Sequence, residues 1–245
     1  MSETEETAPD RERIAANLAA IRERIAAACR QAGRPADAVR LVAVTKYVAA
    51  DLTRLVLESG CQDLAESRPQ AIWSKAEVLA AGQPPARWHL VGHLQRNKIR
   101  RTLPLLSMLH SLDSLRLLES ITGEAATAAL PTPCEVLVEV NLTADPGRSG
   151  VPVAEAAALV DAASRAPGIR LRGLMGMAGH PDAAGADPRR DFARLRGLRD
   201  DLALRLPDPD MLGELSMGMS NDFEAAIQEG ATIVRIGSAI FEGLR

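Results

Sequence analysis

The chain alternates between short apolar runs and longer amphipathic segments. Over residues 10–33 apolar residues recur at spacings of three and four, and Gly33 and Pro35 follow the last of them. This spacing predicts an amphipathic helix that ends near the glycine. Its apolar positions are Ile14, Leu18, Ile21, Ile25 and Ala28. The polar and acidic residues 1–9 show no such pattern, and we expect them to be disordered.

Eight short apolar runs follow this helix, and each has the length of a β-strand. They occupy residues 39–45, 61–66, 87–92, 107–112, 134–141, 169–177, 213–218 and 231–237. Helical patterns separate most of the runs. These patterns occupy residues 51–60, 68–82, 114–129, 151–168, 188–206 and 220–230.

Strands that alternate with helices predict a parallel sheet, because parallel neighbours need crossover connections. The runs are almost continuously apolar, which indicates strands that are covered on both faces. Eight of them in 245 residues predict an α/β fold, a single (β/α)8 TIM barrel with an extra N-terminal helix, as one domain over residues 10–245. No GxGxxG pattern follows the first strand, which disfavours a dinucleotide-binding fold.

Composition and charge exclude several classes of protein. The chain is 47% hydrophobic and 25% charged, as is usual for soluble globular proteins, and its net charge of -3 offers no field that would attract nucleic acid or an anionic membrane. No apolar stretch reaches the roughly 18 to 20 residues that a membrane span requires, and the N-terminus lacks a signal-peptide pattern. We expect a cytoplasmic protein with neither nucleic acid nor membrane as a partner.

The cysteines and histidines do not predict a metal site. Cys29, Cys61 and Cys134 are far apart and show no CxxC spacing, so we expect reduced, partly buried thiols. His89 and His93 have a spacing that would suit metal ligands on a helix, but WHLVGHLQ predicts a strand followed by a turn.

One lysine stands at the end of the first apolar run. In a barrel, functional residues lie where strands end and lead into helices, and Lys46 follows the run LVAVT at such a position. Partial desolvation disfavours an ammonium ion, which would leave the amine free to attack an aldehyde. Taken alone, the position is explained more simply by a lysine that reaches from the strand end to solvent.

Two segments near the C-terminus suggest a phosphate site. The segment 213–230 leads from a strand into a helix that Ser220 or Asn221 can cap, and the first amides of such a helix attract anions. After the last strand, Gly237 allows close backbone approach and Ser238 adds a hydroxyl. The loops after strands seven and eight are the recurrent phosphate site of barrels. Two ordinary turns are the alternative.

A reactive lysine and a phosphate site together suggest a phosphorylated aldehyde bound as a Schiff base, and pyridoxal 5'-phosphate has both groups. Arg235 lies within the last predicted strand, where an unpaired guanidinium would be costly. Next to a pyridine nitrogen, this cation would keep the nitrogen unprotonated and weaken the ring as an electron sink. An ion pair on the outer face of the barrel is the alternative for Arg235.

Several segments closely resemble the YggS/PROSC family of pyridoxal phosphate homeostasis proteins, in order from about residue 10 to the C-terminus. These segments are AVTK (43–46), WHLVGHLQRNK (88–98), EVNLTADPGRSG (139–150), GLMGM (173–177), LSMGMSNDFEAAI (215–227) and VRIGSAIF (234–241). The resemblance implies a fold like the N-terminal barrel of alanine racemase. It also implies that Lys46 forms the aldimine and that Arg235 lies beside the pyridine nitrogen.

The resemblance assigns the remaining cofactor-binding residues as well. It places the phosphate on Ser216, Ser220, Gly237 and Ser238, and it places Asn97, Met175 and Met217 along the pocket. Two positions depart from the family pattern. Ser67 stands where the family has the asparagine of GEN, and Glu242 is an additional residue in the family's IFGxR tail.

The same resemblance bears on catalysis. Alanine racemase and related decarboxylases take a second catalytic residue from a β-domain, and we expect no such domain here because the chain ends at Arg245. The only tyrosine, Tyr47, adjoins Lys46, and alternation along a regular strand would direct it away from the pocket.

Our first hypothesis is therefore a monomeric protein without robust catalysis. It would store, deliver or buffer pyridoxal phosphate, contact pyridoxal-phosphate-dependent enzymes transiently and affect amino-acid metabolism indirectly. The alternatives are a slow single-domain amino-acid racemase or lyase that uses pyridoxal phosphate, and a barrel that binds another phosphorylated metabolite.

Overall fold

The computed structural model describes residues 8–80, 85–128, 133–143, 145, 147–180 and 187–244. The segment predicted to be disordered, 1–9, lies outside these residues except for its last two positions, with which the first helix begins. Among the described residues, no helix is both long and apolar enough to cross a membrane.

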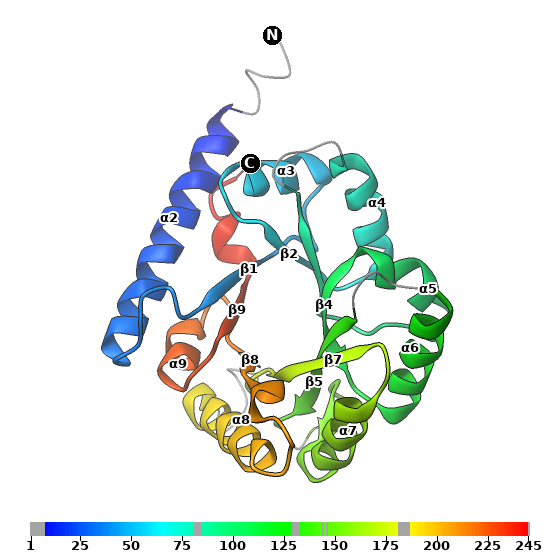
Figure 1. Cartoon of the computed structure of the whole chain (residues 1–245). Coiled ribbons are helices and arrows are strands. Elements are labelled where there is room, and N and C mark those ends of the chain that lie inside the picture. The colour runs from blue at the N-terminus through cyan, green and yellow to red at the C-terminus, as the bar shows by residue number, and fades with distance from the viewer. Residues whose placement is uncertain are drawn as a thin grey trace.

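The strands form a closed parallel barrel, as predicted (Figure 1). Hydrogen-bonded neighbours follow the order β4-β3-β2-β1-β9-β8-β7-β5, and β4 pairs with β5 to close the ring. The ring consists of β1 (Arg40–Val44), β2 (Asp63–Glu66), β3 (Arg87–Leu90), β4 (Leu106–Leu112), β5 (Cys134–Asn141), β7 (Ile169–Gly176), β8 (Glu214–Ser216) and β9 (Ile233–Ile236). A short strand that the sequence did not predict, β6 (Val151–Pro152), pairs with the end of β5.

Helices surround the barrel (Figure 1). They are α2 (Ala8–Gln31), α3 (Ala50–Glu58), α4 (Pro69–Leu79), α5 (Ile99–Thr102), α6 (Leu115–Ala128), α7 (Val153–Arg165), α8 (Pro188–Ala203) and α9 (Phe223–Gln228). Short 3-10 helices are η1 (Arg96–Lys98), η2 (Leu103–Leu105), η3 (Pro209–Leu212) and η4 (Ser238–Ile240). The turns η1, α5 and η2 together form the connection between β3 and β4, for which the sequence predicted no helix.

The N-terminal helix α2 packs along the outside of the ring against α3, α9 and η4. The apolar positions predicted for this helix are buried. Asn17 of α2 donates its side-chain N–H groups to the carbonyls of Ile240 and Glu242, at 3.0 and 2.9 Å. The additional residue of the tail, Glu242, is therefore held in a turn that α2 fixes.

Apolar side chains form two clusters, one on each side of the barrel wall. The larger cluster fills the space between the strands and the helices. The smaller one lies on strands of the ring and comprises Val42, Ala65, Met108, Leu137, Met175 and Ile233. The three cysteines, which the sequence predicted to be partly buried, are free and buried.

The helix α9 begins later than the sequence predicted. Asp222 occupies its N-cap position, so the cap predicted at Ser220 or Asn221 is wrong. The Asp222 carboxylate accepts from the amide of Met219 at 2.6 Å, and this bond closes the turn before the helix.

We predict that Gly173→Ala destabilises the barrel, because an added Cβ on β7 would lie 1.8 Å from the carbonyl oxygen of Glu214 on β8. We expect urea denaturation to give a loss of about 2 kcal/mol or more in the free energy of unfolding. Gly197→Ala in α8 is the matched control, because no described atom other than its chain neighbours and the backbone of its own helix lies within 4 Å of its Cβ position. Replacing that helical glycine should raise stability by about 0.5–1 kcal/mol. Equal effects at both positions would contradict this account.

Candidate functional site

A cavity of about 490 Å³ opens where the barrel strands end. Its volume lies in the range that small organic ligands occupy. The lining comes from the ends of β1 and β9 and from the segments that follow β1, β5, β7, β8 and β9. This is the C-terminal end of the barrel, where the sequence predicted the functional residues to lie.

Lys46 lines the cavity from the turn after β1. The strand ends at Val44, so Lys46 and Tyr47 are not strand residues and need not point in opposite directions. Tyr47 also lines the cavity, with 88% of its surface exposed, and its ring centroid lies 4.8 Å from Lys46 Nζ. The prediction that Tyr47 lies away from the pocket is therefore wrong. Lys46 is exposed, so the partial desolvation expected of it is not observed.

The residue before Lys46 is fixed by a buried ion pair that the sequence analysis missed. Lys75 Nζ of α4 lies 2.6 Å from Glu66 Oε1 of β2 and donates to the carbonyl of Thr45 at 2.8 Å. The hydroxyl of Thr45 donates to the same oxygen of Glu66 at 2.6 Å. All three side chains are buried. The end of β1, and with it the start of the lysine turn, is thus tied to β2 and α4.

Arg235 brings a positive charge from β9 to the cavity, although only 4% of its surface is exposed. Its Nη1 donates to Ser216 Oγ at 2.7 Å, and its Nη2 donates to the carbonyl of Gly176 at 3.2 Å. Burial lowers the pKa of Arg235 to about 10, against the opposing effect of Glu139 and Asp222. The guanidinium therefore stays protonated at neutral pH, and the outer-face ion pair considered for it is wrong.

The turns after β8 and β9 contact each other beside the cavity. The amide of Gly237 donates to Ser220 Oγ at 3.4 Å. A Cβ at Gly237 would lie 3.1 Å from the carbonyl oxygen of Val44, so glycine suits this close approach to β1. Burial raises the pKa of Asp222, which lines the same cavity. The two predicted phosphate segments are thus adjacent in space.

The structure brings together five of the nine residues predicted to bind a cofactor. The five that line the cavity are Lys46, Ser220, Arg235, Gly237 and Ser238. Ser216 does not line it but is fully buried and contacts Arg235. The departure from the family pattern at Ser67 follows β2, is half-buried and does not line the cavity.

Three further predicted residues lie away from the cavity wall. Met175 belongs to the smaller apolar cluster, on the ring strands. Met217 is fully buried in the larger cluster. Asn97 is exposed in η1. None of these three is among the described residues that line the cavity.

Several lining residues were not singled out from the sequence. Arg148, His180 and Asp222 are the polar ones. Arg148 Nη1 donates to the carbonyl of Ala178 at 3.0 Å, which links the segment after β5 to the segment after β7. Arg148 and Asp222 lie within segments that carry the family resemblance, so the motifs could have identified them. His180 lies after the GLMGM segment, and no motif pointed to it.

His89 and His93 lie on a strand and in the following segment, as predicted, so they do not share a helix face. Among the described residues, no group of three or more His, Cys, Asp or Glu side chains is arranged to hold a metal ion.

Comparison with known proteins gives one family match and many relatives. The family described as alanine racemase, N-terminal domain, matches residues 16–244. The pyridoxal phosphate homeostasis protein of Pseudomonas aeruginosa is 40% identical over 228 residues, which cover 93% of this chain and 94% of that protein. The human protein of the same name is 35% identical over 233 residues, covering 91% and 84% of the two chains.

Solved structures show the same likeness. PipY of Synechococcus elongatus, in a structure with PLP bound, has a TM-score of 0.79 and 30% identity, covering 93% of this chain and 99% of that one. D-threonine aldolase of Filomicrobium marinum has a TM-score of 0.71 at 16% identity, covering 94% of this chain and 60% of that one. At that low identity the second likeness concerns the fold alone.

We predict that Lys75→Met destabilises the protein by about 3 kcal/mol, because it leaves the buried carboxylate of Glu66 without its cation. The double variant Glu66→Gln/Lys75→Met should recover part of this loss, since no unpaired charge remains. Urea denaturation measures both. Lys98→Met, at a half-buried lysine of η1, is the control and should change stability by less than about 0.5 kcal/mol. A double variant no more stable than Lys75→Met would show that the charge imbalance is not the cause.

Proposed function

Because the chain belongs to the pyridoxal phosphate homeostasis protein family, with an alanine racemase N-terminal domain over most of its length, we propose that it binds pyridoxal 5'-phosphate in the cavity at the C-terminal end of its barrel. The observation that carries the proposal is that one cavity is lined by the exposed Lys46, by Ser220, Gly237 and Ser238, and by the buried Arg235. PipY, which is 30% identical and has the same fold, has been solved with PLP bound.

Each end of the cofactor has a counterpart in the cavity. Lys46 supplies the amine that holds the aldehyde as a Schiff base. Ser220, Gly237 and Ser238 receive the phosphate, and Arg235 faces the ring nitrogen. When bound, the cofactor supplies the aldehyde and an aromatic ring that can accept electrons. The geometry that supports this orientation is the proximity of the turns after β8 and β9 to each other and to Arg235.

The residues that do not line the cavity have supporting roles in this proposal. Ser216 accepts from Arg235 and so orients the guanidinium. Met175 packs on the ring strands, and Met217 is buried just before the turn that carries Ser220. Asn97 is assigned by the family resemblance alone, since in the structure it is exposed in η1.

We propose that the protein stores, delivers or buffers the cofactor, and that its effect on amino-acid metabolism is indirect. Arg235 supports this role because a permanent cation beside the ring nitrogen keeps that nitrogen unprotonated and makes the ring a weak electron sink. The exposure of Lys46 also supports it, since an exposed Schiff base is accessible to the amine of another protein. A monomer in the cytoplasm that contacts pyridoxal-phosphate-dependent enzymes transiently fits this role.

One observation favours a second candidate function, a slow amino-acid racemase or lyase. Tyr47 lines the cavity beside Lys46, and a phenol can donate or accept a proton in such reactions. Tyr47 is 88% exposed, however, and it adjoins Lys46 in the same turn. A tyrosine in that position is open to solvent over most of its surface, so we rank this function second.

We predict that the purified protein, mixed with pyridoxal phosphate, develops a visible absorbance band that borohydride removes. Mass spectrometry after reduction should find the cofactor on Lys46 and on neither Lys75 nor Lys98. Lys46→Ala should lose the band, whereas the control Lys98→Ala should keep it. A protein that stays colourless overturns the Schiff-base proposal. Phosphate binding that is unaffected by Lys46→Ala would point instead to another phosphorylated metabolite.

We also predict that the loaded protein does not turn over free amino acids above the rate of pyridoxal phosphate in solution. Chiral chromatography and assays for released keto acids would measure this with wild-type protein and with Tyr47→Phe. The two proteins should be indistinguishable. Turnover that falls tenfold or more in Tyr47→Phe, and disappears in Lys46→Ala, would establish the enzyme as the correct function.

A further inference from the structure

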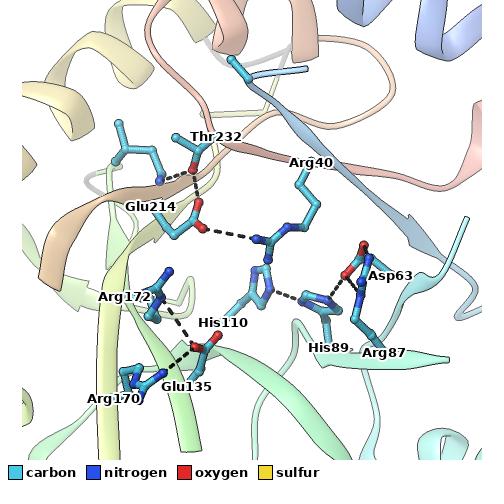
Figure 2. Close-up of polar contacts among 12 residues, drawn as sticks. Arg40, Asp63, Arg87, His89, His110, Glu135, Arg170, Arg172, Glu214 and Thr232 are labelled. Carbon is cyan, nitrogen blue, oxygen red and sulfur yellow. Dashed lines mark hydrogen bonds and ion pairs between the residues drawn. The ribbon is translucent and has the colours of Figure 1, made fainter. Parts of the chain in front are cut away.

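A continuous series of hydrogen-bonded side chains runs through the interior of the barrel, from the cavity to the opposite end. Ser216 Oγ, which accepts from Arg235, lies 2.8 Å from His110 Nδ1. His110 Nε2 lies 2.9 Å from His89 Nδ1, and His89 Nε2 lies 3.0 Å from Asp63 Oδ1. Figure 2 shows the part of this series from His110 to Asp63. We call Asp63, His89, His110 and Ser216 the interior chain.

Every member of the interior chain is buried. Exposed fractions are 0% for Ser216 and His110, 1% for His89 and 5% for Asp63. The members come from β8, β4, β3 and β2, so they cross the barrel from strand to strand. At Asp63 the chain reaches the N-terminal end of the barrel, where Arg87 binds the carboxylate through Nε at 2.9 Å and Nη2 at 2.5 Å. Buried groups of this kind require partners, because water cannot satisfy them.

The proton positions follow from the two ends of the chain. Arg235 can only donate, and an ionised Asp63 can only accept, so His89 Nε2 must carry a proton. A neutral His89 then accepts at Nδ1 from the Nε2–H of His110. His110 in turn accepts at Nδ1 from the hydroxyl of Ser216. All donors run in one direction, and each meets an acceptor.

The reverse direction does not satisfy every group. It would require a doubly protonated His89 and would leave the hydroxyl hydrogen of Ser216 without an acceptor in the interior chain. Burial lowers the pKa of His110 well below its usual value, and the positive charges of Arg235 and Arg40 act in the same direction. Burial opposes ionisation of Asp63, but hydrogen bonds from His89 and Arg87 outweigh it and lower the pKa of Asp63 to about 2. Both effects agree with a neutral His110 and an ionised Asp63, and the neutral form of His89 rests on the order of donors and acceptors alone.

Charged groups lie at each end of the interior chain. At the cavity end, Glu139 and Asp222 act on Arg235 through space. At the other end, Arg87 pairs with Asp63. Arg40 lies nearby and pairs with Glu214 (Figure 2). The distance between Arg40 Nη2 and Glu214 Oε1 is 3.5 Å. No hydrogen bond joins Glu139 or Asp222 to the guanidinium among the contacts of the described residues, so Ser216 is its side-chain partner.

We propose that Asp63, His89 and His110 are positioning residues, which act through Ser216 to hold the guanidinium of Arg235 at the floor of the cavity with both histidines in the neutral Nε2–H form. Because the hydroxyl of Ser216 is committed to His110, its lone pairs remain directed at Arg235. The role toward a bound ring rests on the proposed function, whereas the proton arrangement is a property of the protein alone.

The first test uses protein without cofactor. In ¹⁵N-histidine NMR spectra between pH 6 and 8, His89 and His110 should each show a protonated Nε2 and an unprotonated Nδ1. Resonances are assigned with His89→Gln and His110→Gln. A proton on Nδ1 of either histidine, or a charged His110 in this range, overturns the proposal whether or not the protein binds pyridoxal phosphate.

The second test measures how a change at His110, away from the cavity, affects binding in the cavity. His110→Phe removes the central link, and we expect the dissociation constant of pyridoxal phosphate to rise about tenfold and the pH profile of the bound absorbance to shift by about one unit. His110→Gln can accept from Ser216 and donate to His89, so it should stay within threefold of wild type. A folded His110→Phe with wild-type affinity and pH profile refutes the positioning role. Wild-type protein that binds no cofactor refutes the proposed function instead.

A third test, with two variants, checks the positioning role if His110→Phe does not fold. Asp63→Asn and Glu214→Gln each remove one carboxylate at the N-terminal end of the barrel, but only Asp63 belongs to the interior chain. We expect Asp63→Asn to weaken binding at least threefold and to shift the pH profile, and Glu214→Gln to leave both unchanged. Equal effects in the two variants would mean a general charge effect and would overturn the proposal.

Discussion

Arg235 carries a permanent charge into the buried interior of the barrel, and much of the site is organised around that charge. A buried guanidinium needs acceptors for its N–H groups, and β8 and β7 provide two of them, Ser216 and the carbonyl of Gly176. In the proposed interior chain, His110 accepts from the hydroxyl of Ser216, which leaves the lone pairs of that oxygen for Arg235. The polar interior therefore extends from the cavity as far as Asp63, whose carboxylate pairs with Arg87 at the other end.

The turn that carries Lys46 also depends on buried charged groups that hold each other in place. Lys46 itself is exposed, but the strand end before it is anchored by Glu66 and Lys75, both buried. A buried ion pair adds little stability over an apolar pair of the same size, yet it fixes geometry because each partner is costly to leave alone. The strand end before the exposed amine is thus fixed, and Lys46 and Arg235 are positioned by separate sets of contacts.

The sequence predicted the barrel well because strand and helix periods depend on local patterns, and each predicted run coincides with a strand of the ring. Its errors arose where tertiary contacts decide. Tyr47 was expected on a regular strand, but β1 ends at Val44. Asp222, rather than Ser220 or Asn221, occupies the N-cap of α9. Glu66, Lys75 and His110 could not be assigned, because nothing in a single sequence shows which strands bring buried polar groups together.

The position of Arg235 also bears on whether the protein only binds its cofactor or catalyses reactions with it. A catalyst that forms carbanions gains from a protonated ring nitrogen, and a cation fixed beside that nitrogen prevents the protonation. In the proposed arrangement the four residues of the interior chain hold the guanidinium of Arg235, and two histidines and an aspartate are buried to do so. A barrel whose interior polar groups serve to hold that charge in place is suited to binding the ring in one electronic state, and under the proposed function the exposed Lys46 is the point at which the bond would be made and released.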